Sequence, residues 1–193
     1  MRSPREILHI DMDGTLVDSK AGSRRRKKLS QETDRPPLEL FLHTEIYRAR
    51  KDVNAICRTH GKFALVLSVL RRTLGLVHEL ATPLGPQVSV FDSPELISSP
   101  EMGRQVGAAL GTAPALLMRG NGALTVGATV EEAVVNAILM ETSAEIQWRA
   151  LCIGEPAWIT GNHNDGEFSK LANREYEAVL RPWQYYLARS RGR

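Results

Sequence analysis

Two carboxylates stand one residue apart at the end of an apolar run near the start of the chain. The segment reads Ile10-Asp11-Met12-Asp13-Gly14-Thr15 and follows Ile7 and Leu8. Carboxylates at this spacing could serve as a nucleophile and a proton donor beside Mg²⁺. Asp-Gly between two apolar runs is also typical of a hairpin turn, in which the Asp side chains bond neighbouring backbone amides. The hairpin interpretation predicts two strands and a turn over residues 6–18.

The same segment resembles the nucleophile motif of the haloacid-dehalogenase-type phosphatases. In that interpretation Asp11 attacks phosphorus and Asp13 protonates the leaving group, and a second acidic cluster holds the metal. The nearest candidate for that cluster is residues 160–166, where Asn162 and Gly166 stand in place of the two acids. A Mg²⁺-dependent phosphatase that uses Asp11 is therefore kept as an alternative, and the structural turn is preferred.

Other chemically useful side chains lie where predicted elements begin or end. A helix is predicted from about 38 to 50, because apolar residues recur there at helical spacing, and Glu39 lies at its start. A β-like segment at 53–57 and a helical one at 61–70 place residues 58–60 where a strand passes into a helix. That position commonly carries chemistry in α/β proteins.

The remaining pattern alternates short strands with helices. Strands are predicted at 76–80, 88–91, 115–119 and 123–126, with Gly120-Asn121-Gly122 interrupting the last two. Helices are predicted at 100–110 with Ser99 as cap, from the Thr129 cap to about 151, and at 168–187 with a break at Pro182. An alternation of this kind predicts an α/β fold.

Length and composition fit one folded domain over 1–193. The chain has 42% hydrophobic and 24% charged residues, and much of its net charge of +3 comes from the run 24–28. That run lies in a predicted exposed loop, 19–37, so nucleic acid is not expected as a partner. A C-terminal loop and helix are expected over 155–193. With no secretory signal at the start and no apolar stretch long enough to cross a bilayer, no membrane partner and a cytoplasmic location are expected.

Beyond the hairpin, the chain resembles the class II aldolase/adducin family. The matching segments follow in order at 11–14 (DMDG), 36–50 (PPLELFLHTEIYRAR), 52–60 (DVNAICRTH), 116–122 (LLMRGNG) and 129–133 (TVEEA). The resemblance implies a central, mainly antiparallel sheet flanked by helices, in a homo-oligomer with sites near subunit interfaces. It also implies that the Asp-x-Asp-Gly segment is a structural hairpin.

The resemblance further implies a lyase whose divalent metal, zinc or else manganese or iron, stabilises an enediolate while a carboxylate moves the proton. That carboxylate falls on Glu39, the family's His-x-His on Arg58 and His60, and its third histidine on Asn121. With only His60 left as a weak metal ligand, we expect no catalytic zinc, because Arg58 is a permanent cation that repels a dication. Glu39, Arg58, His60 and Asn121 are the predicted catalytic residues, and Arg58 and Asn121 are also expected to bind substrate.

Two further expectations come from the family pattern. The chain begins shortly before the hairpin, so an N-terminal truncation relative to the family, without its phosphate-binding segment, is expected. Tyr185 is a predicted substrate-binding residue, because family members use C-terminal aromatic residues near subunit interfaces. Two functions remain open: carbon–carbon cleavage or decarboxylation of a small hydroxy, keto or aromatic acid, and a non-catalytic role like that of the adducin head.

Overall fold

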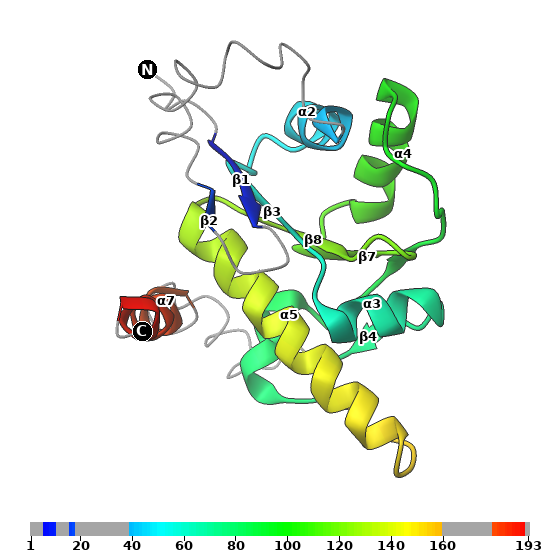
Figure 1. The fold of residues 1–193 in the computed structure, drawn as a ribbon, viewed down its shortest axis with the longest axis vertical. Coiled ribbons are helices and arrows are strands. Elements are labelled where there is room, and N and C mark those ends of the chain that lie inside the picture. The colour runs from blue at the N-terminus through cyan, green and yellow to red at the C-terminus, as the bar shows by residue number, and fades with distance from the viewer. Residues whose placement is uncertain (1–5, 11–15, 18–38, 160–178, 192–193) are drawn as a thin grey trace.

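A mixed β-sheet with helices on both faces forms the centre of the protein, as the computed structural model shows (Figure 1). The structure describes residues 6–10, 16–17, 39–159 and 179–191. The strand order in the main sheet is β2-β1-β3-β8-β7-β6. These strands are β1 (Glu6–Ile10), β2 (Leu16–Val17), β3 (Ala55–Thr59), β6 (Val90–Phe91), β7 (Ala115–Met118) and β8 (Ala123–Gly127).

Antiparallel pairs outnumber parallel ones in this sheet, as the family resemblance implies. β1 with β2, β3 with β8, and β7 with β8 are antiparallel, whereas β1 with β3 and β6 with β7 are parallel. The predicted hairpin is confirmed by the register of β1 and β2, in which Ile10 faces Leu16. The turn itself, with Asp11 and Asp13, lies outside the described residues, as does the basic loop.

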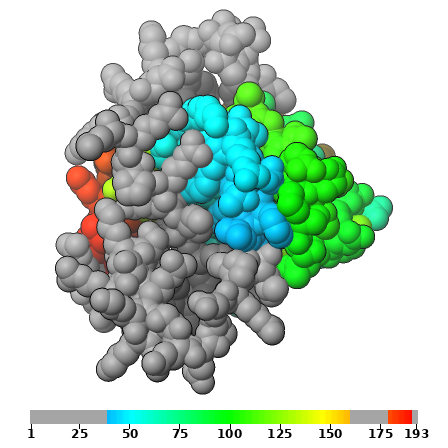
Figure 2. All heavy atoms as spheres, turned by 90° about the horizontal axis from the view of Figure 1, so that it is seen from above, coloured from blue at the N-terminus to red at the C-terminus, as the bar shows by residue number. Residues whose placement is uncertain are grey.

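One face of the sheet is covered by α2 (Leu40–Ala49) and α4 (Pro100–Leu110), which lie side by side in Figure 2. Both helices were predicted, and Ser99 caps α4 by accepting a hydrogen bond from the Met102 amide at 3.3 Å. The helices approach closely at Gly103, where an added Cβ would lie 2.4 Å from the Phe41 carbonyl oxygen. Buried apolar residues of both helices, including Leu42, pack on β3, β7 and β8.

The opposite face is covered by α3 (Lys62–Val69) and the long helix α5 (Val130–Leu151). The predicted cap of α5 is confirmed, since the Thr129 hydroxyl accepts from the Glu132 amide at 3.2 Å. α7 (Arg181–Arg191) contacts α5, and Pro182 lies in its first turn, where proline is tolerated. Residues 168–178 of the predicted C-terminal helix lie outside the described part of the chain.

The segment between α3 and α4 departs from the prediction. The predicted strand at 76–80 is wrong: β4 (Leu74–Gly75) precedes it, and the 3₁₀-helix η1 (Glu79–Leu84) starts within it. The predicted strand at 88–91 is divided into β5 (Gln87–Val88), which pairs with β4, and β6, which pairs with β7. Pro83 and Gly85 terminate this stretch before any long ladder can form.

None of the helices in the described ranges is long and apolar enough to cross a bilayer. The single-domain assignment to 1–193 also includes residues outside those ranges and stays a prediction.

Candidate functional site

Three of the predicted site residues meet on the face of the sheet covered by α2 and α4. Arg58 lies in β3, opposite Leu124 of β8, and alternation along the strand puts it on the same face as buried Ile56. Glu39 immediately precedes α2, and Asn121 lies in the turn between β7 and β8. The strand, the helix start and the turn therefore bring residues from distant parts of the sequence to one point.

Arg58 is fully buried, with 0% of its surface exposed, and its guanidinium donates to protein groups on every nitrogen. Nε and Nη2 donate to the two carboxylate oxygens of Glu39, both at 3.0 Å. Nη1 donates to the backbone carbonyl of Ala123 at 2.7 Å. This paired, two-point contact is the strong form of an arginine–carboxylate interaction.

Asn121 closes the group by contacting both charged partners. Its side-chain oxygen accepts from Arg58 Nη2 at 3.2 Å, and its amide nitrogen donates to Glu39 Oε1 at 3.1 Å. The three side chains thus form a ring of mutual hydrogen bonds, here called the closed cluster. Only 11% of the Glu39 side chain is exposed, so this carboxylate lies between the buried cation and solvent.

The turn that carries Asn121 depends on Gly122. Its φ is +74°, and an added Cβ would lie 2.1 Å from the carbonyl oxygen of Thr59 at the end of β3. A side chain at this position would therefore push the turn off the strand. Gly120 also has positive φ, at +70°, but nothing lies within 4 Å of its added Cβ.

The other two predicted site residues are not part of the closed cluster in the described structure. His60 follows β3 and is partly buried, and no hydrogen bond in the described ranges joins it to Glu39, Arg58 or Asn121. Tyr185 is 54% exposed on α7, where its hydroxyl accepts from Arg189 Nη1 at 3.0 Å. The catalytic role of His60 and the substrate-binding role of Tyr185 stay predictions.

The donor set at the closed cluster does not fit a divalent metal. The position expected for the first ligand holds a guanidinium, which is a permanent cation and has no lone pair to donate. The neighbouring Cys57 packs against α5 on the opposite face of the sheet from Arg58, so it does not contribute a ligand at the closed cluster. Among the described residues, no group of three or more His, Cys, Asp or Glu side chains could hold a metal ion.

One partly buried carboxylate with a positioning role was not identified from the sequence. Glu141 of α5 accepts hydrogen bonds from the Phe63 and Ala64 amides, at 2.9 and 3.0 Å, and so caps the start of α3. Gly61 leaves the room for it, because an added Cβ would lie 2.1 Å from the Glu141 carboxylate. The available signal was a carboxylate three residues after Ile138, within the apolar stripe of the predicted helix.

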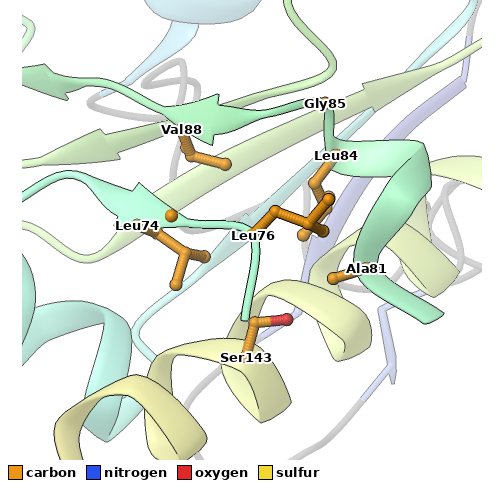
Figure 3. A pocket seen from close by; sticks show the side chains of 8 residues that line it. Leu74, Leu76, Ala81, Leu84, Gly85, Val88 and Ser143 are labelled. Carbon is orange, nitrogen blue, oxygen red and sulfur yellow. The ribbon is translucent and has the colours of Figure 1, made fainter. Parts of the chain in front are cut away.

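A small apolar hollow lies on the opposite side of the sheet, among η1, β4, β5 and α5 (Figure 3). It is lined by Leu74, Gly75, Leu76, Ala81, Leu84, Gly85, Val88 and Ser143. It encloses no space large enough for a water molecule, so it is not a ligand pocket. Ser143 Oγ is 2.9 Å from His78 Nε2, and this contact ties the start of η1 to α5.

Comparison with known proteins agrees with this fold. The family profile described as the class II aldolase and adducin N-terminal domain matches residues 1–148. The chain therefore belongs to the class II aldolase and adducin family. A solved L-fuculose 1-phosphate aldolase superposes with a TM-score of 0.65 at 23% identity, over 84% of this chain and 68% of that one, and supports the fold.

Among curated relatives, decarboxylase NovR of Streptomyces niveus is 30% identical over 185 residues, covering 95% of this chain and 63% of its own. An aldolase of Rhodospirillum rubrum for 5-methylthioribulose 1-phosphate and 5-deoxyribulose 1-phosphate is 29% identical over 153 residues, covering 79% and 63%. The chain thus spans less than two thirds of the length of these relatives. The relatives are lyases of two kinds, and neither name specifies a substrate for this chain.

Proposed function

We propose that this chain is a metal-independent lyase that cleaves a carbon–carbon bond next to a carbonyl group in a small hydroxy, keto or aromatic acid. The observation that carries the proposal is the closed cluster, in which a buried guanidinium and a carboxylate pair at positions that the family resemblance assigns to the site. The cluster retains the two components that such a reaction needs, namely a fixed positive charge and a proton-accepting group.

Charge balance supports a specific order of events. A buried arginine requires one negative charge beside it, and in the resting protein Glu39 supplies that charge. If Glu39 accepts the hydroxyl proton of a substrate, it becomes neutral and the guanidinium loses its counter-charge. A negative oxygen that develops on the substrate at the same moment can replace it.

In a retro-aldol step these two changes coincide. Glu39 takes the hydroxyl proton, the O–H electrons form the new carbonyl, and the carbon–carbon bond electrons move onto the other carbonyl to give an enolate. Arg58 Nη2 and the Asn121 amide, which both contact Glu39 Oε1 at rest, would then donate to the enolate oxygen. Proton return from Glu39 to the enolate carbon completes the cycle.

In a decarboxylation the substrate brings the negative charge itself. Breaking the bond to CO₂ moves that charge onto the neighbouring carbonyl oxygen, which would occupy the same position beside Arg58. Protonation of the carbon then requires Glu39 to arrive as the neutral acid. The relatives include both reaction types, so the choice between aldol cleavage and decarboxylation is part of the test.

A second candidate, a non-catalytic binding or structural protein like the adducin head, is favoured by one observation. The guanidinium of Arg58 is fully buried and already donates to Glu39, Asn121 and the Ala123 carbonyl. A cluster satisfied in this way can act as a structural replacement for a metal centre without any turnover.

Assays in the presence of EDTA distinguish the two candidates. The protein is incubated with 4-hydroxy-2-oxopentanoate, a hydroxy keto acid, and with 3,4-dihydroxybenzoate, an aromatic acid, and aldehyde and CO₂ release are measured. We expect turnover of one compound that EDTA does not abolish, and a loss of roughly 10²-fold or more in kcat for Glu39→Gln. Asn121→Ala, which leaves the ion pair in place, should lower kcat by about 10-fold or more.

The matched control is Glu101→Gln, which alters an exposed carboxylate of α4 paired with Arg104 and should leave kcat unchanged. Absence of turnover with both compounds by a folded protein contradicts the lyase proposal and supports the non-catalytic candidate. Turnover that Glu39→Gln and Asn121→Ala leave intact would show that the chemistry takes place elsewhere.

A further inference from the structure

A second charged group lies on the other side of the β7–β8 turn from Asn121. It consists of Arg71, which follows α3, Arg119, which follows β7, and Asp92, which follows β6, and is here called the open corner. Asp92 Oδ1 lies 3.1 Å from Arg71 Nε and 2.5 Å from Arg119 Nε. One carboxylate oxygen therefore holds two guanidinium groups within a few ångströms of each other.

The open corner carries more positive than negative charge. Asp92 is the one acid in the two ion pairs, and exposed Arg72 adds a further positive charge next to Arg71. The side chains of Arg71 and Asp92 are 62% and 50% exposed, whereas that of Arg119 is 26% exposed. A solvated anion can therefore reach the two cations from outside the protein.

Asp92 does not satisfy Arg119 fully. The Nε–H of Arg119 is buried and has no aligned hydrogen-bond acceptor within the described part of the chain, although Asp92 lies close to it. The adjoining Gly120 has nothing within 4 Å of its added Cβ, so the turn that follows Arg119 is not covered at this point. A buried donor without an aligned acceptor points to a ligand that can align with it.

The backbone at Arg71 supports the same interpretation. Its φ of 54° is in the left-handed region that glycine normally occupies at a helix end. The Arg71 and Arg72 amides donate to the Ser68 and Leu67 carbonyls, both at 3.0 Å, as in an ordinary glycine-terminated helix. Arginine is therefore present at a backbone position that favours glycine, which has no side chain. The contact of Arg71 with Asp92 gives this arginine a role.

We propose that Arg71 and Arg119 form a binding site for a phosphate-type dianion, in which Asp92 is an internal competitor for the same guanidinium groups. Two arginines suit tetrahedral oxyanions because their planar forks donate in pairs. A dianion is preferred to a monoanion because it must compete with the Asp92 carboxylate. The site is separate from the closed cluster, and the proposal does not rest on the lyase function.

Calorimetric titrations at low, constant ionic strength test the proposal, with inorganic phosphate in one arm and glycerol 3-phosphate in the other. Asp92→Asn should bind at least about fivefold more tightly, because it removes the competitor and keeps the shape. Arg119→Gln should bind roughly tenfold more weakly. Arg71→Gly should also weaken binding, and should not lower the Tm, because glycine relieves the left-handed backbone.

Arg104→Gln, which removes an exposed arginine of α4, is the matched control and should leave affinity unchanged. Tighter binding of glycerol 3-phosphate than of inorganic phosphate identifies a phosphomonoester as the ligand, and the reverse order identifies free phosphate; both support the site. The proposal is overturned if the wild-type protein binds neither anion at millimolar concentration. It is equally overturned if Asp92→Asn does not tighten binding, or if Arg104→Gln weakens it as much as Arg119→Gln does.

Discussion

The β7–β8 turn separates two arginine-containing groups that are organised in opposite ways. On the Asn121 side, Arg58 is fully buried and paired with Glu39 in a ring of hydrogen bonds. On the Arg119 side, two arginines share one oxygen of Asp92, and the group is partly open to solvent. Positive charge is thus balanced in the closed cluster and in excess in the open corner.

The difference follows from the cost of removing charge from water. A buried guanidinium without a partner costs several kcal/mol, so the protein supplies a carboxylate, an amide and a carbonyl for Arg58. A solvated arginine has no such requirement, and exposed ion pairs contribute only about 0–1 kcal/mol. The arginines of the open corner can therefore donate to a ligand directly. Arg58 can donate to a ligand only if the negative charge of that ligand replaces the charge of Glu39.

The largest expected effect comes from opening the closed cluster. Arg58→Met leaves the Glu39 carboxylate without its cation and the Ala123 carbonyl without its donor, so the free energy of unfolding should fall by about 3–5 kcal/mol. The double variant with Glu39→Gln should lose much less than the sum of the two single losses. Urea denaturation measures both.

The control for this series is Arg104→Met, in which the removed arginine belongs to an exposed ion pair with Glu101. Its effect should stay within about 0.5 kcal/mol. If Arg58→Met costs no more than this control, the buried pair does not stabilise the fold and the contrast between the two groups fails.

The next largest effects are expected at the two glycines of the β7–β8 turn, Gly120 and Gly122. Gly122→Ala should cost roughly 3 kcal/mol or more, because its Cβ collides with the Thr59 carbonyl in addition to the strain of a positive φ. Gly120→Ala should cost only the strain of a positive φ, about 1–2 kcal/mol, because nothing lies within 4 Å of the added Cβ. Thermal and urea unfolding of the two variants should keep this order, and equal losses would show that the two sides of the turn are packed alike.

The contact between His78 and Ser143 is partly buried and contains no ion pair, so it separates the effect of burial from that of paired charge. Burial lowers the pKa of His78 from its usual 6.5, so the folded protein binds the proton less readily than the unfolded chain. Stability should therefore be full above about pH 6.5 and should decline as the pH falls below that value. Unfolding of the wild type and of His78→Asn between pH 8 and 5 tests this, and an identical slope in both proteins would contradict it.

The smallest effect is expected in the open corner. Asp92→Asn removes an exposed carboxylate from two ion pairs and should change the free energy of unfolding by no more than about 0.5 kcal/mol. The same urea series measures it. A loss of several kcal/mol would show that Asp92 is a structural counter-ion of the same kind as Glu39.

The sequence was informative where local rules decide the structure. Ser99 and Thr129 could be identified as helix caps because their hydroxyls bond backbone amides three residues later. Glu39, Arg58 and Asn121 could be selected from the family pattern, one residue at a time. Their mutual pairing could not be predicted, because the hydrogen bonds join residues 19 to 82 positions apart and depend on how α2 lies on β3.

The remaining errors have similar causes. The strand expected at 76–80 was wrong because η1 is stabilised by burying Ala81 and Leu84 against α5, which no short apolar run reveals. Arg71 and Arg119 were not selected, because they belong to different elements and meet only through Asp92. The geometry of the closed cluster and of the open corner therefore depends on contacts between elements that are far apart in the sequence.

The central claim is that the Arg58 guanidinium replaces the divalent metal of the family's site. Metal analysis of the purified protein by mass spectrometry, alongside the double variant Arg58→His/Asn121→His, tests it most directly. We expect the wild type to contain no stoichiometric zinc, manganese or iron, and the double variant, which restores three histidines with His60, to bind zinc near one equivalent. One equivalent of zinc, manganese or iron in the wild type, retained by Arg58→His/Asn121→His with no gain in affinity, would contradict the account.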